Sequence, residues 1–355
     1  KQFDWVNDLK IRFGYGVTGN NDFDASYMAN TLSRDQYWML PSGSWAFVYG
    51  PSSNVNPYLG WEEKKEWNIG VDYSFFGNRM YGKFDYYRGM IYEVNVPQPP
   101  YPNGKQWQNI GEMESKGWEF EVGGDIIQNK DFTWTSSLNM SHNSGKILTM
   151  YGNNSRMDGN AMDEPGWPGD ASRIEEGAEI GAFHMWKFAG FDDKGDFLLY
   201  NKDGEVIPAS QKSVDDKQYI GNYLPKVMMG WNNTFTYKNF DLGINMRSWI
   251  GFDVLNTYPM YLGIQGQSGA GQWNLWKPAL DDPKYKDIRG VKQLCDYFLE
   301  DGSFLKIDAI TLGYTLALSK YTKWAERLRV YGTVGNVATI TGYSGHNPEV
   351  NITGW

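Results

Sequence analysis

The chain has 355 residues, of which 41% are hydrophobic, 21% charged and 16% aromatic. Its formal net charge of -9 argues against nucleic acid as a partner, because phosphate backbones require a broad positive field. A single cysteine, Cys295, excludes an intrachain disulfide and a cysteine-rich zinc site, and the three histidines are scattered. No stretch approaches the roughly 18 consecutive apolar residues of a transmembrane helix, which does not argue against membrane β-strands.

The first runs of the chain alternate between apolar and polar residues at every second position, as strands with one buried face do. From Leu9 to Val17, apolar side chains alternate with basic residues and glycines. A second run covers residues 67–75 and a third covers residues 79–87. The Gly77-Asn78 turn between them predicts a tight β-hairpin.

The later runs follow the same rule. They cover residues 118–123, 132–141, 227–235, 240–246, 304–318 and 327–336. Short polar turns join the first four of these in pairs, which predicts two more hairpins. In the run from Phe304 the apolar phase changes between Ile307 and Ile310, which predicts a β-bulge.

The connections between the predicted strands alternate between short turns and very long loops. The long loops cover about residues 18–64, 93–114, 143–226 and 251–302. Soluble domains rarely keep loops of this length, whereas outer-membrane barrels combine short periplasmic turns with long extracellular loops. Aromatic residues near the strand ends suit an interfacial girdle: Trp67, Tyr86, Tyr87, Trp118, Trp134 and Tyr237. A soluble β-sandwich would show the same alternation and stays an alternative.

Several segments resemble those of one family. Residues 9–20, LKIRFGYGVTGN, resemble a signature strand of the SusC/RagA-like TonB-dependent outer-membrane transporters. Further segments similar to motifs of this family follow in its order at residues 61–73, 109–121, 220–226, 237–242, 304–314 and 343–350. The resemblance therefore extends over nearly the whole chain.

The resemblance implies an all-β fold, namely the C-terminal part of a 22-stranded antiparallel transmembrane β-barrel with a plugged lumen. About nine or ten strands are predicted here, too few to close such a barrel. We therefore expect the plug domain, the TonB box and the earlier strands to lie outside this sequence. Residues 1–355 are then one barrel portion with long extracellular loops, located in the outer membrane of a Gram-negative cell.

The family's activity gives the functional expectation. The resemblance implies active import of oligosaccharides or oligopeptides, with a SusD-like surface lipoprotein as a lid over the barrel. Energy would come from the TonB-ExbB-ExbD complex through the plug region, so neither an enzymatic residue nor a cofactor is expected in this chain. Two alternatives stay open, which are a soluble all-β carbohydrate-binding or glycan-degrading protein and a passive porin.

Loop aromatic residues are the best candidates for substrate contacts, because an aromatic face can cover the C–H face of a sugar ring. They are Trp107, Trp167, Trp186, Trp273 and Trp276. Packing of the loops on one another, or against a lid, would explain the same residues equally well.

The acidic turn 192–196 is a weak calcium candidate through Asp192, Asp193 and Asp196, because it lacks the spacing and the terminal glutamate of an EF-hand. Turn formation alone explains these residues. Neighbouring glutamates such as Glu62 and Glu63 would point to opposite faces of a strand, so they are predicted to be surface or lumen charges and not a glycosidase pair. His142, His346 and Cys295 are predicted to be structural.

Overall fold

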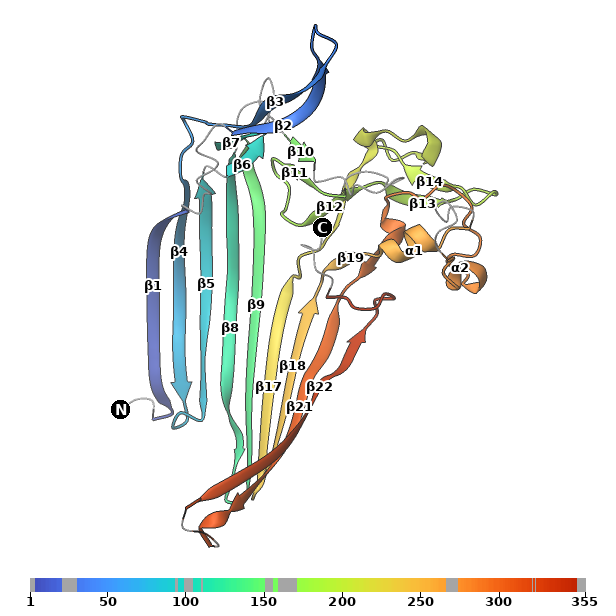
Figure 1. Ribbon diagram of the computed structural model, residues 1–355. Coiled ribbons are helices and arrows are strands. Elements are labelled where there is room, and N and C mark those ends of the chain that lie inside the picture. The colour runs from blue at the N-terminus through green and yellow to red at the C-terminus, as the bar shows by residue number, and fades with distance from the viewer. Residues whose placement is uncertain are drawn as a thin grey trace.

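A nine-stranded antiparallel sheet forms most of the molecule (Figure 1). The computed structural model describes residues 4–20, 31–92, 95–98, 105–109, 111–150, 156–158, 171–265, 274–320, 322 and 324–349. The strands of the large sheet, in spatial order, are β1 (Val6–Asn20), β4 (Glu62–Phe75), β5 (Met80–Tyr92), β8 (Gly111–Gln128), β9 (Phe132–Met150), β17 (Val227–Tyr237), β18 (Phe240–Ile250), β21 (Phe304–Ala317) and β22 (Arg327–Thr341). The predicted all-β fold with antiparallel strands is confirmed.

Short turns join these strands at one end of the sheet and long segments join them at the other (Figure 1). In the β4–β5 turn, Gly77 and Asn78 have positive φ angles of 70° and 66°, and both backbone N–H groups donate to the Asn7 side chain. In the β17–β18 turn, Lys238 has a φ of 51° and its N–H donates to the Asp131 carbonyl. The three predicted hairpins are present.

The strand register places the apolar residues of neighbouring strands on one face. Ile11, Val71, Phe84, Phe120 and Met140 lie opposite one another in turn across β1, β4, β5, β8 and β9. Side chains on this apolar face are open to the surroundings, and Ile11 is 71% exposed. The intervening residues define a polar face with Lys, Arg, Asp, Glu, Asn and Gly side chains.

Aromatic residues mark the edges of the apolar face. Near the long-loop end, the Trp67 and Tyr86 rings lie 5.6 Å apart. Near the short turns, Trp134 and Phe235 stack at 5.6 Å. Tyr87, however, pairs with Asn68 and Gly117 in the polar-face register, so its predicted place in the girdle is wrong.

The predicted bulge in β21 is confirmed at Asp308. Met246 of β18 pairs with Ile307 whereas Asn245 pairs with Ala309, which leaves Asp308 as the additional residue. Pairing with β22 shifts at the same point. The bulge keeps Ile307 and Ile310 on the apolar face although they are three residues apart.

Four strands of the large sheet, β1, β4, β8 and β9, extend into the predicted loops. β1 continues to Asn20 and pairs there with Glu62, inside the range expected as the first loop. β9 continues to Met150, which pairs with Gly111. Within the described residues, no helix is long and apolar enough to span a membrane.

The long segments carry small elements of their own. β2 (Thr31–Met39), β3 (Trp45–Asn54), β7 (Lys105–Asn109) and β6 (Asn95–Gln98) form a four-stranded sheet. The other small strands are β10 (Arg156–Asp158) with β11 (Arg173–Glu175), β12 (Ala182–Met185) with β16 (Gln218–Asn222), β13 (Lys187–Phe191) with β14 (Phe197–Tyr200) and β15 (Val206–Pro208), and β19 (Asp253–Leu255) with β20 (Leu299–Asp301). Helices α1 (Thr257–Leu262) and α2 (Pro278–Asp281) and the 3-10 turns Ala209–Gln211, Val214–Asp216, Asp296–Phe298 and Leu318–Lys320 complete the described chain.

Candidate functional site

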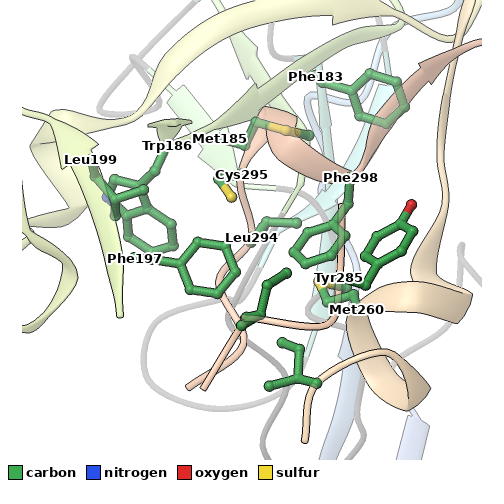
Figure 2. Close-up of a cluster of buried hydrophobic side chains, with 12 residues drawn as sticks. Phe183, Met185, Trp186, Phe197, Leu199, Met260, Tyr285, Leu294, Cys295 and Phe298 are labelled. Carbon is green, nitrogen blue, oxygen red and sulfur yellow. The ribbon is translucent and has the colours of Figure 1, made fainter. Parts of the chain in front are cut away.

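Two long segments fold together into one unit at the long-loop end of the sheet, which we call the loop cap and define as the described residues of 171–226 and 251–302. The main hydrophobic core of the chain lies inside this unit (Figure 2). Its buried members are Phe183, Met185, Trp186, Phe197, Leu199, Met260, Ile264, Tyr285, Ile288, Leu294, Cys295 and Phe298. Both segments contribute, so neither can bury its apolar side chains without the other.

Backbone hydrogen bonds join the two segments of the loop cap directly. The Trp186 N–H donates to the Leu294 carbonyl at 3.2 Å, and the Asp296 N–H donates to the Trp186 carbonyl at 3.3 Å. The Asp296 carboxylate accepts the Phe188 N–H at 2.6 Å. Burial raises the pKa of this carboxyl above its usual value, while the Phe188 hydrogen bond opposes the shift.

A glycine allows one of these close approaches. Gly195 has a φ of 81°, and its carbonyl accepts the backbone N–H groups of Arg289 and Gly290 at 3.0 and 3.1 Å. A side chain at this position would place its Cβ 2.3 Å from the Asp287 carbonyl oxygen. Position 195 therefore requires glycine for both backbone conformation and space.

Trp186 lies in the core of the loop cap. Its side chain is 4% exposed, and its indole N–H donates to the Ser213 carbonyl at 2.8 Å. The ammonium groups of Lys212 and Lys217 lie 4.4 and 4.8 Å from the ring centroid. This arrangement assigns the Trp186 ring to packing between the two segments.

Trp276 lies at the edge of the same core and is half-buried. Its ring packs edge-to-face against Tyr258 at 5.8 Å and against Tyr285 at 5.1 Å. Tyr258 is 46% exposed and also contacts the His346 ring at 6.1 Å. We call Trp276 and Tyr258, together with His346 of the segment after β22, the aromatic edge of the cap, and it offers open ring surface to a ligand.

The other three candidate tryptophans receive no such placement. Trp107 belongs to β7, and its side chain lies outside the described residues. Trp167 and Trp273 also lie outside the described residues.

In the acidic turn between β13 and β14, one carboxylate accepts hydrogen bonds from the backbone of the turn itself. Asp192 accepts the backbone N–H groups of Lys194 at 2.9 Å and Asp196 at 2.8 Å. These hydrogen bonds, with that of Asp196 the largest contribution, lower the pKa of Asp192. Asp193 and Asp196 are exposed. Across the described part of the chain, no group of three or more His, Cys, Asp or Glu side chains is placed to hold a metal ion.

Sequence reasoning missed a polar network, centred on the buried Asn256, that joins the cap to the segment after β22. Asn256 is 4% exposed, and its amide donates to Glu300 and to the Ser344 hydroxyl, both at 3.1 Å. Ser344 donates to Glu300 through its backbone N–H at 2.9 Å and its hydroxyl at 2.8 Å. Glu300 and Ser344 lie 44 and 88 positions after Asn256 in the chain, so no local sequence signal could have predicted the network.

Ion pairs extend over the polar face of the large sheet. Arg12 contacts Asp72 and Asp85, each at 2.9 Å. At the other side of the sheet, Arg247 and Lys306 each contact Glu349 at 2.9 Å. Glu349 belongs to the segment after β22, which therefore lies over the polar face.

The rim between the large sheet and the cap holds a cavity of about 640 Å³. Its lining includes the charged residues Glu179, Lys226, Asp253 and Asp301. Two of these carboxylates are already engaged, because Asp253 accepts the Asn222 N–H at 2.9 Å and Asp301 accepts the Ser303 hydroxyl at 2.6 Å. Apolar residues such as Ile250 and Phe252 also line the cavity, and the Asn222–Asp253 hydrogen bond beside it joins the two segments of the cap.

A family model described as "TonB dependent receptor-like, beta-barrel" matches residues 2–337. The chain belongs to this family. It is therefore part of an outer-membrane barrel, with the apolar face toward lipid and the polar face toward the lumen. In outer-membrane barrels the short turns lie on the periplasmic side and the long loops on the extracellular side.

Comparisons with individual proteins agree with this assignment. TonB-dependent receptor P3 of Formosa agariphila is 30% identical over 99% of this chain and 37% of its own length. TonB-dependent receptor SusC of Bacteroides thetaiotaomicron is 28% identical over 99% of this chain and 36% of its own length. The structure of the RagAB peptide transporter superposes with a TM-score of 0.81 at 26% identity, covering 97% of this chain and 38% of that one. The chain thus spans little more than a third of these relatives.

Proposed function

We propose that this chain supplies part of the wall and the extracellular cap of a TonB-dependent importer that works with a SusD-like surface lipoprotein. The similarity to SusC and to the RagAB peptide transporter supports the proposal. The observation that carries it is the loop cap itself. Two long loops share one buried core and connect through Asn256, Glu300 and Ser344 to a segment lying over the lumen face.

The imported substrate is proposed to be an oligosaccharide, with an oligopeptide as the second candidate. The aromatic edge of the cap supports the first, because the exposed Tyr258 ring and the half-buried Trp276 ring can cover apolar faces of sugars. The similarity to RagAB, which is a peptide transporter, favours the second. In either case the chain supplies binding and passage, without a catalytic group or cofactor of its own.

In the soluble alternative the apolar face of the sheet would be in contact with water, whereas in a membrane barrel it is in contact with lipid. Leu9, Ile11 and Phe13 are 59%, 71% and 74% exposed on one strand, and Leu312 and Val334 on the far strands are 55% and 62% exposed. A soluble domain rarely leaves an apolar surface of this extent open to water. Lipid is the solvent that this face fits.

The experiment compares uptake by cells that make the full-length receptor with its lipoprotein. Defined labelled oligosaccharides and oligopeptides are supplied separately, in cells with and without TonB. We expect TonB-dependent accumulation of one class, and a Tyr258→Ala variant that raises the half-saturating concentration about tenfold. Trp324→Ala is the matched control, because this aromatic residue is 85% exposed in the β21–β22 turn at the opposite end.

Three results would contradict the proposal. Accumulation that is equal without TonB would indicate a passive pore. Release of the receptor from membranes without detergent would favour the soluble alternative. Equal half-saturating concentrations for Tyr258→Ala and Trp324→Ala would show that the aromatic edge does not take part in substrate binding.

A further inference from the structure

The apolar face contains a hollow of about 470 Å³ near the periplasmic end. Val122, Leu138 and Trp231 form one row of its lining, because they pair in turn across β8, β9 and β17. In the next row Gly124 pairs with Ser136, so small residues meet where the neighbouring rows have large ones. The apolar belt therefore has a depression at this point, and all of the walls belong to this chain.

A step in the sheet deepens the hollow. β5 begins at Met80, which pairs with Gly124, whereas β8 continues to Gln128 (Figure 1). Phe76 in the β4–β5 turn also lines the hollow, is 56% exposed and has a φ of 56°. This positive φ belongs to the hairpin turn, in which Gly77 and Asn78 also have positive φ angles. The exposed ring stacks on the Trp5 ring, with the two centroids 6.0 Å apart, and forms the turn side of the hollow.

A cation lies at the periplasmic side of the hollow. Arg79 is exposed, lines the hollow and donates one hydrogen bond to the Asp125 carbonyl oxygen at 3.2 Å. No carboxylate among the described residues forms an ion pair with it. The guanidinium group is planar and carries five donors, so a single bond leaves donors for an anion.

We propose that this hollow binds one phospholipid of the inner leaflet, with an acyl chain in the hollow and the phosphate on Arg79. The volume lies in the ~300–1,000 Å³ range of small-molecule sites. The Trp231 indole N–H donates to the Ser136 hydroxyl at 2.9 Å, which satisfies its polar atom and leaves the ring as an apolar wall. An exposed cation beside an apolar hollow is complementary to an anionic headgroup on a hydrocarbon tail.

The test measures phospholipid retained by the full-length receptor purified from the outer membrane. Native mass spectrometry counts bound lipids as the receptor is washed with increasing detergent, and extraction identifies their headgroups. We expect one phospholipid to resist washing in the wild type. Arg79→Gln removes the phosphate contact and should weaken retention about tenfold, the effect of losing a charge-assisted hydrogen bond. Val122→Trp fills the hollow and should abolish retention.

Lys130→Gln is the matched control, because Lys130 is an exposed cation in the β8–β9 turn at the same end that does not line the hollow. It should retain lipid as the wild type does. Heat-modifiable migration in gels shows that each variant is folded. Loss of all lipid from the wild type under mild washing, equal retention in all variants, or retention of lipopolysaccharide instead of phospholipid would overturn the inference. These outcomes leave the import proposal untouched, because the inference depends only on the membrane location.

Discussion

Replacing Asn256 with alanine should detach the loop cap from the segment after β22. The variant loses one hydrogen bond to a charged group, Glu300, and one to Ser344. It also loses the side-chain cap of α1, where the Asn256 amide oxygen accepts the Tyr258 N–H at 3.2 Å. A bond to a charged acceptor contributes roughly 1.5 kcal/mol, a neutral bond about 1 kcal/mol and a helix cap about 1 kcal/mol. Because such effects are not fully additive, we expect a local loss of about 3 kcal/mol.

Hydrogen exchange measured by mass spectrometry on the detergent-solubilised receptor reports this change locally. A loss of about 3 kcal/mol raises the local opening equilibrium about 100-fold, so amides in residues 251–262 and 342–347 should exchange about 100-fold faster. The central strands β8 and β9 should exchange as before.

Asn201→Ala provides the matched control for this experiment. Asn201 also accepts backbone N–H groups, those of Asp203 and Glu205, but within a single exposed turn of the cap. Its replacement should accelerate exchange only around residues 201–205. Unchanged exchange in residues 342–347 of the Asn256→Ala variant would show that the network does not hold the segment after β22 to the cap, which refutes the reasoning.

Three further outcomes follow from the loop cap. Trp186→Ala removes a large core side chain and should cost about 3–5 kcal/mol of cap stability, seen as faster limited proteolysis within residues 171–226 with the sheet resistant. Burial raises the pKa of the Cys295 thiol to about 12, so iodoacetamide at pH 8 should alkylate it only after denaturation; labelling of the folded receptor would contradict this placement. Backbone N–H groups lower the pKa of Asp192 below its ordinary value of 3.8, so its contribution to the β13–β14 turn is complete above that value and is lost as pH falls through the lowered pKa. Exchange in residues 191–197 should therefore differ between the wild type and Asp192→Ala at pH 7 and converge in strong acid.

The large sheet could be predicted from the sequence because its rule is local. Successive side chains of a strand point to opposite faces of the sheet. The alternation that begins at Leu9 and at Trp67 therefore already predicted which residues of these two runs lie on the apolar face. The bulge at Asp308 could be predicted for the same reason, because the alternation of apolar and polar residues shifts by one position there. The end of β9 could not be predicted, because residues 141–145 include no apolar side chain that would indicate a face. The strand reaches Met150 only through its pairing with β8.

The loop cap could not be predicted in this way. Trp186 stands in a loop and resembles a ligand-binding residue, but its neighbours Ser213 and Leu294 lie 27 and 108 positions away in the chain. A local pattern carries no information about such contacts. Trp276 looked the same in the sequence, and only the fold distinguishes the half-buried ring at the cap edge from the buried ring in the core.

The cap is therefore a folded part of the barrel mouth with fixed connections to the lumen face. Glu349 is 13% exposed where it contacts Arg247 and Lys306, so the segment after β22 is held against β18 and β21. The same segment contacts the cap through Ser344. A substrate that displaced the aromatic edge would move Tyr258, whose backbone N–H donates to the Asn256 side chain of this network. The structure thus provides one continuous set of contacts from the proposed binding surface to the charged wall of the lumen.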